Sequence, residues 1–569
     1  MSFQEMTPHI SHAILSPSSK SGDPPQMRPI QEIVEKLGLN WNDIEPYGRD
    51  KAKVPLDLFN REKPMKGKLV VVTAITPTPA GEGKTTTTLG LTDGLNLVGR
   101  NATAVIRQPS LGPLFGRKGG GTGGGLATAE PATDINLHFT GDFHAIQSAH
   151  NFLAAMTENS VKNHEIEHFN PDGITWRRVT DAEDRALRNI AIGMGKSADG
   201  PVRQTGYDIS AASEIMAIIA LAQDYSDLRA RLSSVVVGWT QDQKPVTAAD
   251  VRAIGSMMVL LKDALKPNIV QTNEGNPVIC HAGPFGNIAH GCSSIVADRL
   301  ALQTSDIVVT EAGFGADLGF EKFMDIKVRQ GGEKPSAAVL VATVRGLKWH
   351  GGIAQKELAA PNPSAVEAGS SNLKHAISIV RRYGLPVVVA INRFPEDSDE
   401  EINIIQEVAK AAGATNAVQA KGFAEGGHGM MDLANELCQV LSEQSATVEL
   451  LYEDEDSIID KVTSLAKKLY QAESLSWAPL TRTTARRFEA NGWNFPICVA
   501  KTHLSISADQ KLRGAPTGHI FPVQEFRIAA GAQQIICLAG DIMTLPGLPS
   551  DPNAFDIDLQ PDGSVTGLL

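Results

Sequence analysis

A hydrophobic run that leads into a glycine-bearing loop is the feature that most constrains the fold of this chain. Residues 68–75 read Lys-Leu-Val-Val-Val-Thr-Ala-Ile, and residues 76–86 continue Thr-Pro-Thr-Pro-Ala-Gly-Glu-Gly-Lys-Thr-Thr. A strand, a tight loop and Lys-Thr at a helix start form a cradle for polyphosphate, because backbone N–H groups and the helix N-terminus face the anion. The pattern predicts an α/β protein with a P-loop NTPase-like, mostly parallel sheet.

The loop pattern also predicts the roles of individual residues. In such loops the lysine reaches the β- and γ-phosphates and the next hydroxyl holds Mg²⁺, which here are Lys84 and Thr85. One departure is visible, since Thr78 stands where the usual pattern has a glycine, five residues before Gly83. The predicted nucleotide-binding residues are Thr78, Pro79, Ala80, Gly81, Glu82, Gly83, Lys84 and Thr85.

Composition limits the classes of protein that fit. The 569 residues exceed the ~250–300 at which single cores stop growing, so several domains are expected. A net charge of −12 argues against nucleic acid or a membrane as partner. The sequence contains no run of ~18 apolar residues, so no membrane span is predicted. Five scattered cysteines without Cys-x-x-Cys spacing predict reduced thiols, no zinc site and a cytoplasmic location.

Periodicity predicts how the elements follow one another. Residues 1–26 are expected to form a flexible tail without a secretory or transit signal. Ile30, Ile33, Val34 and Leu37 recur at helical spacing and predict the first helix. Short β-branched runs separated by helices then imply a mostly parallel sheet covered on both faces. The expected strands are 68–75, 102–107, 306–310, 337–344, 386–392 and 535–539.

The same reading divides the chain into regions. Residues 27–144 are predicted to form the first part of the nucleotide-binding core, and residues 145–300 an inserted, mainly helical domain. Residues 301–452 are expected to continue the core. An acidic stretch at 453–456 marks the start of a C-terminal α+β region that reaches residue 569.

A second loop rich in glycine follows the run 102–107. Six of the seven residues 119–125 are glycine, and Arg107, Arg117 and Lys118 precede them closely. Glycine runs are often flexible linkers. Because this one follows a β-run and carries cations, we favour a second loop that approaches an anion.

Several long blocks, in one order along about residues 27–569, resemble formate–tetrahydrofolate ligases, also called formyltetrahydrofolate synthetases. Besides the two loops, the blocks are Asp134-Ile-Asn-Leu-His-Phe-Thr-Gly-Asp142, Asp184-Arg-Ala-Leu-Arg188, Leu261-Lys-Asp-Ala-Leu-Lys-Pro-Asn268, Asn287-Ile-Ala-His-Gly-Cys292, Thr310-Glu-Ala-Gly-Phe-Gly-Ala-Asp-Leu-Gly319, Val341-Ala-Thr-Val-Arg-Gly-Leu-Lys-Trp-His-Gly-Gly352, Gly514-Ala-Pro-Thr-Gly518 and Gly540-Asp-Ile-Met-Thr-Leu-Pro-Gly-Leu-Pro549.

The resemblance implies a reaction. Formate, MgATP and tetrahydrofolate would become 10-formyltetrahydrofolate, ADP and phosphate through formyl phosphate. It also implies a homotetramer and activation by a monovalent cation, K⁺ or NH₄⁺. The residues fit this chemistry, because joining two anions in a mixed anhydride requires dense positive charge and backbone donors.

Residue by residue, the resemblance gives catalytic roles to Lys84 and Arg107. Arg107 would hold formyl phosphate with its planar fork. Asp142 and His144 would position or deprotonate the attacking amine. 

For the pterin, the resemblance implies a slot with Phe394 and Pro395 on one side and Phe423 on the other. Phe423 stands where the family usually has Trp, Arg393 where it has His, and Gln108 where it mostly has Glu. ATP use is therefore a firmer expectation than folate affinity.

Three other functions compete with this one. Another P-loop ligase could activate a small carboxylate and pass the acyl group elsewhere. A nucleotide-dependent switch or maturation factor is disfavoured because the paired-cysteine cluster site of that group is missing. A homologue that binds without turnover is disfavoured by the retained Lys84, Arg107 and Asp142.

Overall fold

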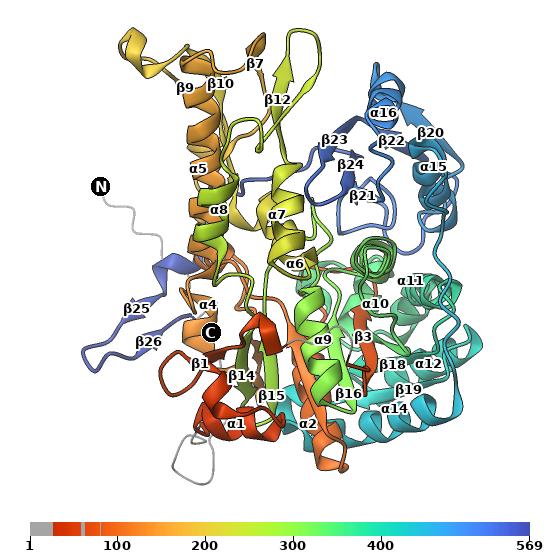
Figure 1. Cartoon of the computed structure of the whole chain (residues 1–569). Coiled ribbons are helices and arrows are strands. Elements are labelled where there is room, and N and C mark those ends of the chain that lie inside the picture. The colour runs from red at the N-terminus through yellow and green to blue at the C-terminus, as the bar shows by residue number, and fades with distance from the viewer. Residues whose placement is uncertain (1–26, 59–62, 80, 569) are drawn as a thin grey trace, which may run out of the picture.

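The computed structural model describes residues 27–58, 63–79 and 81–568. The predicted tail, residues 1–26, and the predicted loop residue Ala80 lie outside this part of the chain. The described chain is a mixed α/β protein whose largest sheet is mostly parallel (Figure 1). The coarse fold class predicted from the sequence is confirmed.

The large sheet is built around seven parallel strands. Its main order is β1-β2-β14-β15-β4-β16-β3-β17-β18-β19, and the part from β15 to β19 is parallel throughout. β1, β2 and β14 add antiparallel pairs at one edge, where β6 also pairs with β14 and β5 with β6. The bounds are β1 Glu45–Pro46, β2 Ala52–Lys53, β3 Lys68–Ala74, β4 Ala102–Ile106, β5 Gly123–Gly124, β6 Ala127–Glu130, β14 Asn268–Thr272, β15 Pro277–Cys280, β16 Ile307–Glu311, β17 Ala337–Ala342, β18 Val387–Asn392 and β19 Asn416–Ala420.

Helices cover both faces of this sheet because its strands are apolar on both sides. In β3, Leu69 and Val71 join the core that includes α9 and α11, whereas Val70 and Val72 join the core of α2 and α14. Alternate side chains of a strand point to opposite faces, which explains this division. The helices around the sheet are α1 Ile30–Lys36, α2 Lys84–Leu97, α3 Leu111–Gly116, α4 Ala132–Asn136, α9 Ile295–Thr304, α10 Val344–His350, α11 Pro363–Arg382, α12 Asp399–Ala411, α13 Gly422–Glu425 and α14 Met431–Glu443.

Residues 145–300 contribute to two parts of the structure. A core of their own lies around the long helix α5 and around α6 (Figure 1). This region holds strands as well as the expected helices, and β14, β15 and α9 from the same range belong to the large sheet and its cover. The additional elements are α5 Asp142–Lys162, α6 Glu214–Leu221, α7 Tyr225–Ser233, α8 Ile254–Leu261, β7 Phe169–Ile174, β8 Arg178–Thr180, β9 Ile190–Ile192, β10 Arg203–Thr205, β11 Tyr207–Ile209, β12 Val236–Thr240 and β13 Pro245–Thr247.

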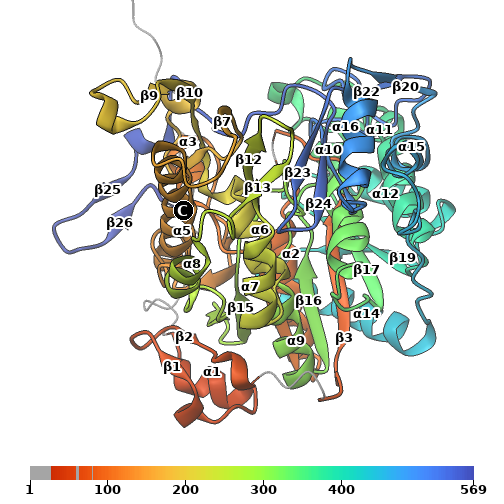
Figure 2. The same cartoon turned by 45° about the horizontal axis from the view of Figure 1, so that its top comes forward.

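The C-terminal region packs on the same face of the large sheet as α10 and α11, as Figures 1 and 2 show. It forms two small sheets, β20-β22 and β21-β24-β23, and the hairpin of β25 and β26 projects from the body (Figure 2). The elements are α15 Ile458–Lys468, α16 Thr481–Ala490, β20 Ser474–Trp477, β21 Ile497–Ala500, β22 Ile520–Val523, β23 Glu525–Ala529, β24 Gln534–Leu538, β25 Asp558–Leu559 and β26 Val565–Thr566.

The six predicted strands correspond to β3, β4, β16, β17, β18 and β24, and the predicted first helix is α1. β24 lies in the small C-terminal sheet and not in the large one. The division into domains stays a prediction. Of the helices in the described residues, none combines the length and the apolarity that crossing a bilayer requires.

Candidate active site

Three neighbouring parallel strands bring the predicted cationic residues to one end of the sheet. β16 lies between β4 and β3. Arg107 follows β4, Glu311 is the last residue of β16, and Lys84 opens α2 after the loop that follows β3. Ligands of open α/β sheets bind outside the carboxyl ends of the strands, so this is the expected place for a site.

The loop 75–83 requires glycine at its last position. Gly83 has a φ of 76°, and a Cβ there would lie 2.4 Å from Nδ2 of Asn392. That amide, at the end of β18, donates a hydrogen bond of 3.2 Å to the carbonyl of Glu82. The close approach of a neighbouring strand therefore fixes the backbone just before Lys84.

The buried side chain of Glu82 stabilises the loop through hydrogen bonds. Its buried carboxylate accepts hydrogen bonds from the N–H of Thr78 at 3.1 Å and from the hydroxyls of Thr78 at 2.9 Å and Thr343 at 2.6 Å. Burial raises the pKa of Glu82, and these bonds and Lys84 oppose that shift. The side chains of Thr78 and Glu82 thus bond each other, while Pro79 is exposed.

Thr85, at the start of α2, contacts Glu311, the last residue of β16. The hydroxyl of Thr85 donates to Oε2 of Glu311 at 2.7 Å, and Nε of Arg107 lies 3.8 Å from Oε1. Glu311 was not singled out as a site residue by the sequence reasoning. A carboxylate at the end of a β-run inside a matching block was the signal available for it.

Burial and neighbouring charges both act on the lysines at this end of the sheet. Burial lowers the pKa of Lys84, and Arg107 lowers it further, while Glu311 and Glu82 act in the opposite direction. Lys118 as a whole residue is exposed, but burial of its amine lowers its pKa to about 8, and Arg107 and Lys84 lower it further while Glu311 opposes the shift. The crowding of positive charge suits a ligand with several negative charges.

Arg107 is surrounded by glycines that make room for it. A Cβ on Gly313 would lie 3.3 Å from Nη1 of Arg107, and one on Gly291 would lie 4.0 Å from it. Nη1 lies 3.5 Å from the carbonyl of Pro284, and the buried Nε has no hydrogen-bond partner in the described structure. An arginine with an unsatisfied N–H in a cationic site is suited to bind an anion.

The glycine-rich run packs against Phe423. A Cβ on Gly124 would lie 3.2 Å from the ring of Phe423, and one on Gly125 only 2.1 Å from its carbonyl oxygen. The N–H of Leu126 donates to that same oxygen at 2.9 Å. The run is therefore a packed element next to α13, and the ring of Phe423 is 55% exposed beside it.

Phe394 lies in the loop after β18, with one face of its ring covered. The guanidinium carbon of Arg345 lies 4.3 Å from the ring centroid, and the same guanidinium pairs with Glu396. The N–H of Phe394 donates to Asp397 at 2.8 Å. Pro395 is exposed. Among the described residues, the rings of Phe394 and Phe423 do not stack on each other.

Asp142 and His144 differ in their surroundings. Asp142 is 3% exposed at the start of α5, and its carboxylate pairs with the buried Lys53 at 2.8 Å and accepts from Asn268 at 2.9 Å. His144 is exposed. Lys53, which the sequence reasoning did not single out, belongs to the short strand β2 between β1 and β14 and offered no local motif.

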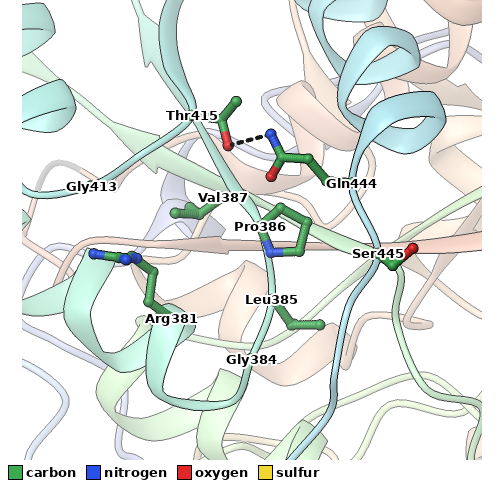
Figure 3. A pocket seen from close by; sticks show the side chains of 9 residues that line it. All are labelled: Arg381, Gly384, Leu385, Pro386, Val387, Gly413, Thr415, Gln444 and Ser445. Atoms are coloured by element: carbon green, nitrogen blue, oxygen red, sulfur yellow. Dashed lines mark hydrogen bonds between the residues drawn. The ribbon is translucent and has the colours of Figure 1, made fainter.

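A separate hollow of ≈ 300 Å³ lies at the other end of β18 (Figure 3). Arg381, Pro386, Val387 and Gln444 line it, and Gln444 donates to the hydroxyl of Thr415 at 3.4 Å. Val387 opens β18 and Phe394 follows its last residue, so the hollow contains none of the predicted site residues.

Fold and site together define a mixed α/β protein with clustered cations at the carboxyl ends of parallel strands. The family model for formate–tetrahydrofolate ligase matches residues 20–569. A formate–tetrahydrofolate ligase of Roseiflexus castenholzii is 50% identical over 554 residues, which are 95% of this chain and 98% of that protein. One of Granulibacter bethesdensis is 49% identical over 546 residues, 95% of each chain. The chain belongs to the formate–tetrahydrofolate ligase family and is an enzyme of the ligase class.

Proposed function

We propose that the enzyme ligates formate to tetrahydrofolate at the expense of ATP, through formyl phosphate, and releases 10-formyltetrahydrofolate, ADP and phosphate. The observation that carries the proposal is the convergence of Lys84, Arg107 and the Thr85–Glu311 pair at the ends of β3, β4 and β16. Such an arrangement places positive charge and N–H donors where two anions have to meet.

The loop 75–83 and the start of α2 are proposed as a P-loop-like nucleotide site. Lys84 would neutralise the β- and γ-phosphates, and the backbone of Gly81 to Gly83 would face them. Thr85 and Glu311 would hold Mg²⁺, because their oxygens already lie 2.7 Å apart and Mg²⁺ prefers one or two carboxylates together with hydroxyl and phosphate oxygens. The ion would neutralise charge on the transferring phosphoryl group.

Arg107 is proposed to hold formate and then the anhydride. A formate oxygen attacks the γ-phosphorus, the bond from phosphorus to the ADP oxygen breaks, and the carboxylate becomes a formyl group with phosphate as its leaving group. The terminal nitrogens of Arg107 would bind two adjacent anionic oxygens, while its Nε faces the carboxylate of Glu311.

In the second step the N10 amine of tetrahydrofolate attacks the formyl carbon, and phosphate departs with one former formate oxygen. The amine must lose a proton. Asp142 and His144 stay the predicted residues for that task. The ion pair of Asp142 with Lys53 and its bond from Asn268 suit a fixed, positioning carboxylate, whereas the exposed His144 is free to exchange protons with solvent.

Phe394, Pro395 and Phe423 are proposed as the pterin site. All three lie beyond the carboxyl ends of strands, Phe394 and Pro395 in the loop after β18 and Phe423 in α13, which follows β19. The exposed ring of Phe423 offers a flat apolar surface beside Gly124 and close to the start of α2.

Further expectations remain proposals from family resemblance and composition. They are a homotetramer, activation by K⁺ or NH₄⁺, a cytoplasmic location, and no nucleic-acid or membrane partner.

The test is formate-dependent product formation by the purified protein. ADP release and 10-formyltetrahydrofolate are measured with formate and tetrahydrofolate present together and with each omitted. The proposal expects both products in equal amounts only when both substrates are present. ADP release that does not depend on formate would contradict the proposal. Formate-dependent ADP release without any formylated folate would favour a ligase for another acceptor.

A further inference from the structure

The C-terminal region reaches the phosphate end of the site through the loop after β21. The buried Lys501 forms an ion pair of 2.7 Å with the buried Asp317, which lies 3.5 Å from the hydroxyl of Thr76 in the loop 75–83. Asn372 donates both to that hydroxyl at 2.9 Å and to the carbonyl of Gly514 at 2.8 Å. The loop after β21 is therefore fixed against the start of the predicted nucleotide loop.

His503 extends from this anchored loop onto an aromatic neighbour of Arg107. Its ring stacks on Phe314 with 4.8 Å between the centroids and an interplanar angle of 24°. Phe314 comes directly after Gly313, which makes room for Arg107, and a Cβ on Gly286 would lie 2.8 Å from its ring. Both stacked rings remain partly exposed. The imidazole is thus held in a fixed plane beside the cationic cluster and is open to a ligand.

The charges around the imidazole are those of the phosphate site. Burial lowers the pKa of His503 to about 4, and Lys501, Lys118 and Lys84 contribute while Asp317 opposes. His503 is therefore neutral at physiological pH. A neutral imidazole offers one N–H donor and one acceptor nitrogen. Within the described part of the chain, neither imidazole nitrogen of His503 has a hydrogen-bond partner.

We propose that His503 is a further residue of the active site, where it donates a hydrogen bond to an oxygen of the formate or phosphoryl group that reacts beside Arg107. This assignment rests on the proposed phosphate site at Lys84 and Arg107. The stack on Phe314 fixes the direction of the N–H, and a donor that is fixed before the reaction stabilises developing negative charge without reorganisation. A single loop thereby makes the distant C-terminal region part of the site.

Two variants separate hydrogen bonding from packing. His503→Phe keeps an aromatic ring on Phe314 and loses the N–H, whereas His503→Asn keeps an N–H donor and loses the ring. The inference expects kcat of His503→Phe to fall by about 10- to 100-fold, since removal of one such donor costs up to ~10²–10³-fold. His503→Asn should retain more activity than His503→Phe. Normal activity in His503→Phe, with His503→Asn impaired, would overturn the inference.

Three further readouts exclude a merely structural effect. The melting temperature of His503→Phe and its Kd for MgADP, from calorimetry, should match the unsubstituted enzyme, whereas its KM for formate or its kcat should change. A loss of activity that is accompanied by a lower melting temperature would assign His503 to packing and overturn the inference. The pH profile of kcat/KM should keep its shape in His503→Asn, because the proposed imidazole does not titrate between about pH 5.5 and 8.5. Loss of a limb in that range would also contradict the inference.

A control distinguishes this failure from failure of the proposed phosphate site. Lys84→Ala should lose MgADP affinity while His503→Phe keeps it. If Lys84→Ala bound MgADP normally, the phosphate site itself would be misplaced. If Lys84→Ala behaved as expected and His503→Phe stayed fully active, only the role of His503 would fall.

Discussion

The phosphate end of the site lies among buried strands, whereas its aromatic end lies on loops at the surface. At the phosphate end, Glu82 accepts three hydrogen bonds and Glu311 is held by Thr85. These groups come from the segments that follow β3 and β17, from the start of α2 and from the end of β16, and the three strands lie in one sheet. Because each group is positioned by several strands, the charges are in place before any ligand arrives.

The side chains at the aromatic end are held by fewer contacts, and these lie at the surface. Phe423 is 55% exposed, and Phe394 is held by the guanidinium of Arg345 on its ring. Side chains on loops change rotamer at small cost. The comparison indicates that substitutions at the phosphate end should affect turnover strongly, while those at the aromatic end should affect affinity modestly.

The largest effect is expected for Lys84→Ala. Removal of the cation that faces the β- and γ-phosphates should lower kcat by several orders of magnitude, since charge clamps in phosphoryl transfer contribute several kcal/mol. Turnover of a folded variant, checked by circular dichroism, measures this. Near-normal turnover would remove the distinction between the two ends.

Arg107→Lys tests whether the geometry of the cation matters as well as its charge. The variant should bind MgATP normally and lose about 10²- to 10³-fold in the coupled reaction, because a lysine offers one point charge where a guanidinium offers a fork. Steady-state kinetics with ATP and formate varied separately measures this.

The anhydride itself is tested with formate labelled with heavy oxygen, which should deliver one label to the released phosphate. Unlabelled phosphate would contradict formyl phosphate. Labelled phosphate together with an unimpaired Arg107→Lys variant would support formyl phosphate as the intermediate and contradict the role proposed for Arg107.

A smaller effect is expected for Glu311→Gln. The amide keeps the size of the side chain and removes the charge next to Thr85 and Arg107, so the Mg²⁺ concentration needed for half-maximal activity should rise by about 10-fold, as a loss of ~1.4 kcal/mol implies. Titration of activity with Mg²⁺ at fixed ATP measures this. An unchanged Mg²⁺ requirement would place the ion elsewhere. Glu333→Gln, at a half-buried carboxylate that pairs with Arg299 of α9, serves as the matched control.

The smallest effects are expected at the aromatic end. Phe423→Trp should lower the KM for tetrahydrofolate by about 2- to 10-fold, since a larger aromatic face contributes ~0.5–1.5 kcal/mol, and Phe394→Ala should raise it. The KM for ATP should stay constant in both variants. Changes confined to ATP affinity, or to the melting temperature, would assign both rings to packing.

Much of the fold was predictable because local patterns report burial. The β-branched runs gave β3, β4, β16, β17 and β18, and the spacing of Ile30, Ile33 and Val34 gave α1. The strands β14 and β15 were missed, since an antiparallel pair within a long range dominated by helices has no separate periodic signal.

The candidate site was predictable only in its local part. The order of strand, loop and Gly-Lys-Thr placed Lys84 at the start of α2. Contacts between distant segments were not accessible in this way. Lys53 beneath Asp142, Arg345 over Phe394 and Asp317 between Thr76 and Lys501 join residues 49 to 241 positions apart.

The sequence by itself determined the class of fold, the family and the identity of the residues at the phosphate loop, because hydrophobic period and glycine spacing are properties of neighbouring residues. The tertiary structure decided which side chains face one another. Glu311 reaches Thr85 because β16 lies beside β3, and His503 lies by the cationic cluster because the C-terminal region packs against the loop after β3. Pairing of strands and packing of regions are set by the whole chain, so no short segment encodes them.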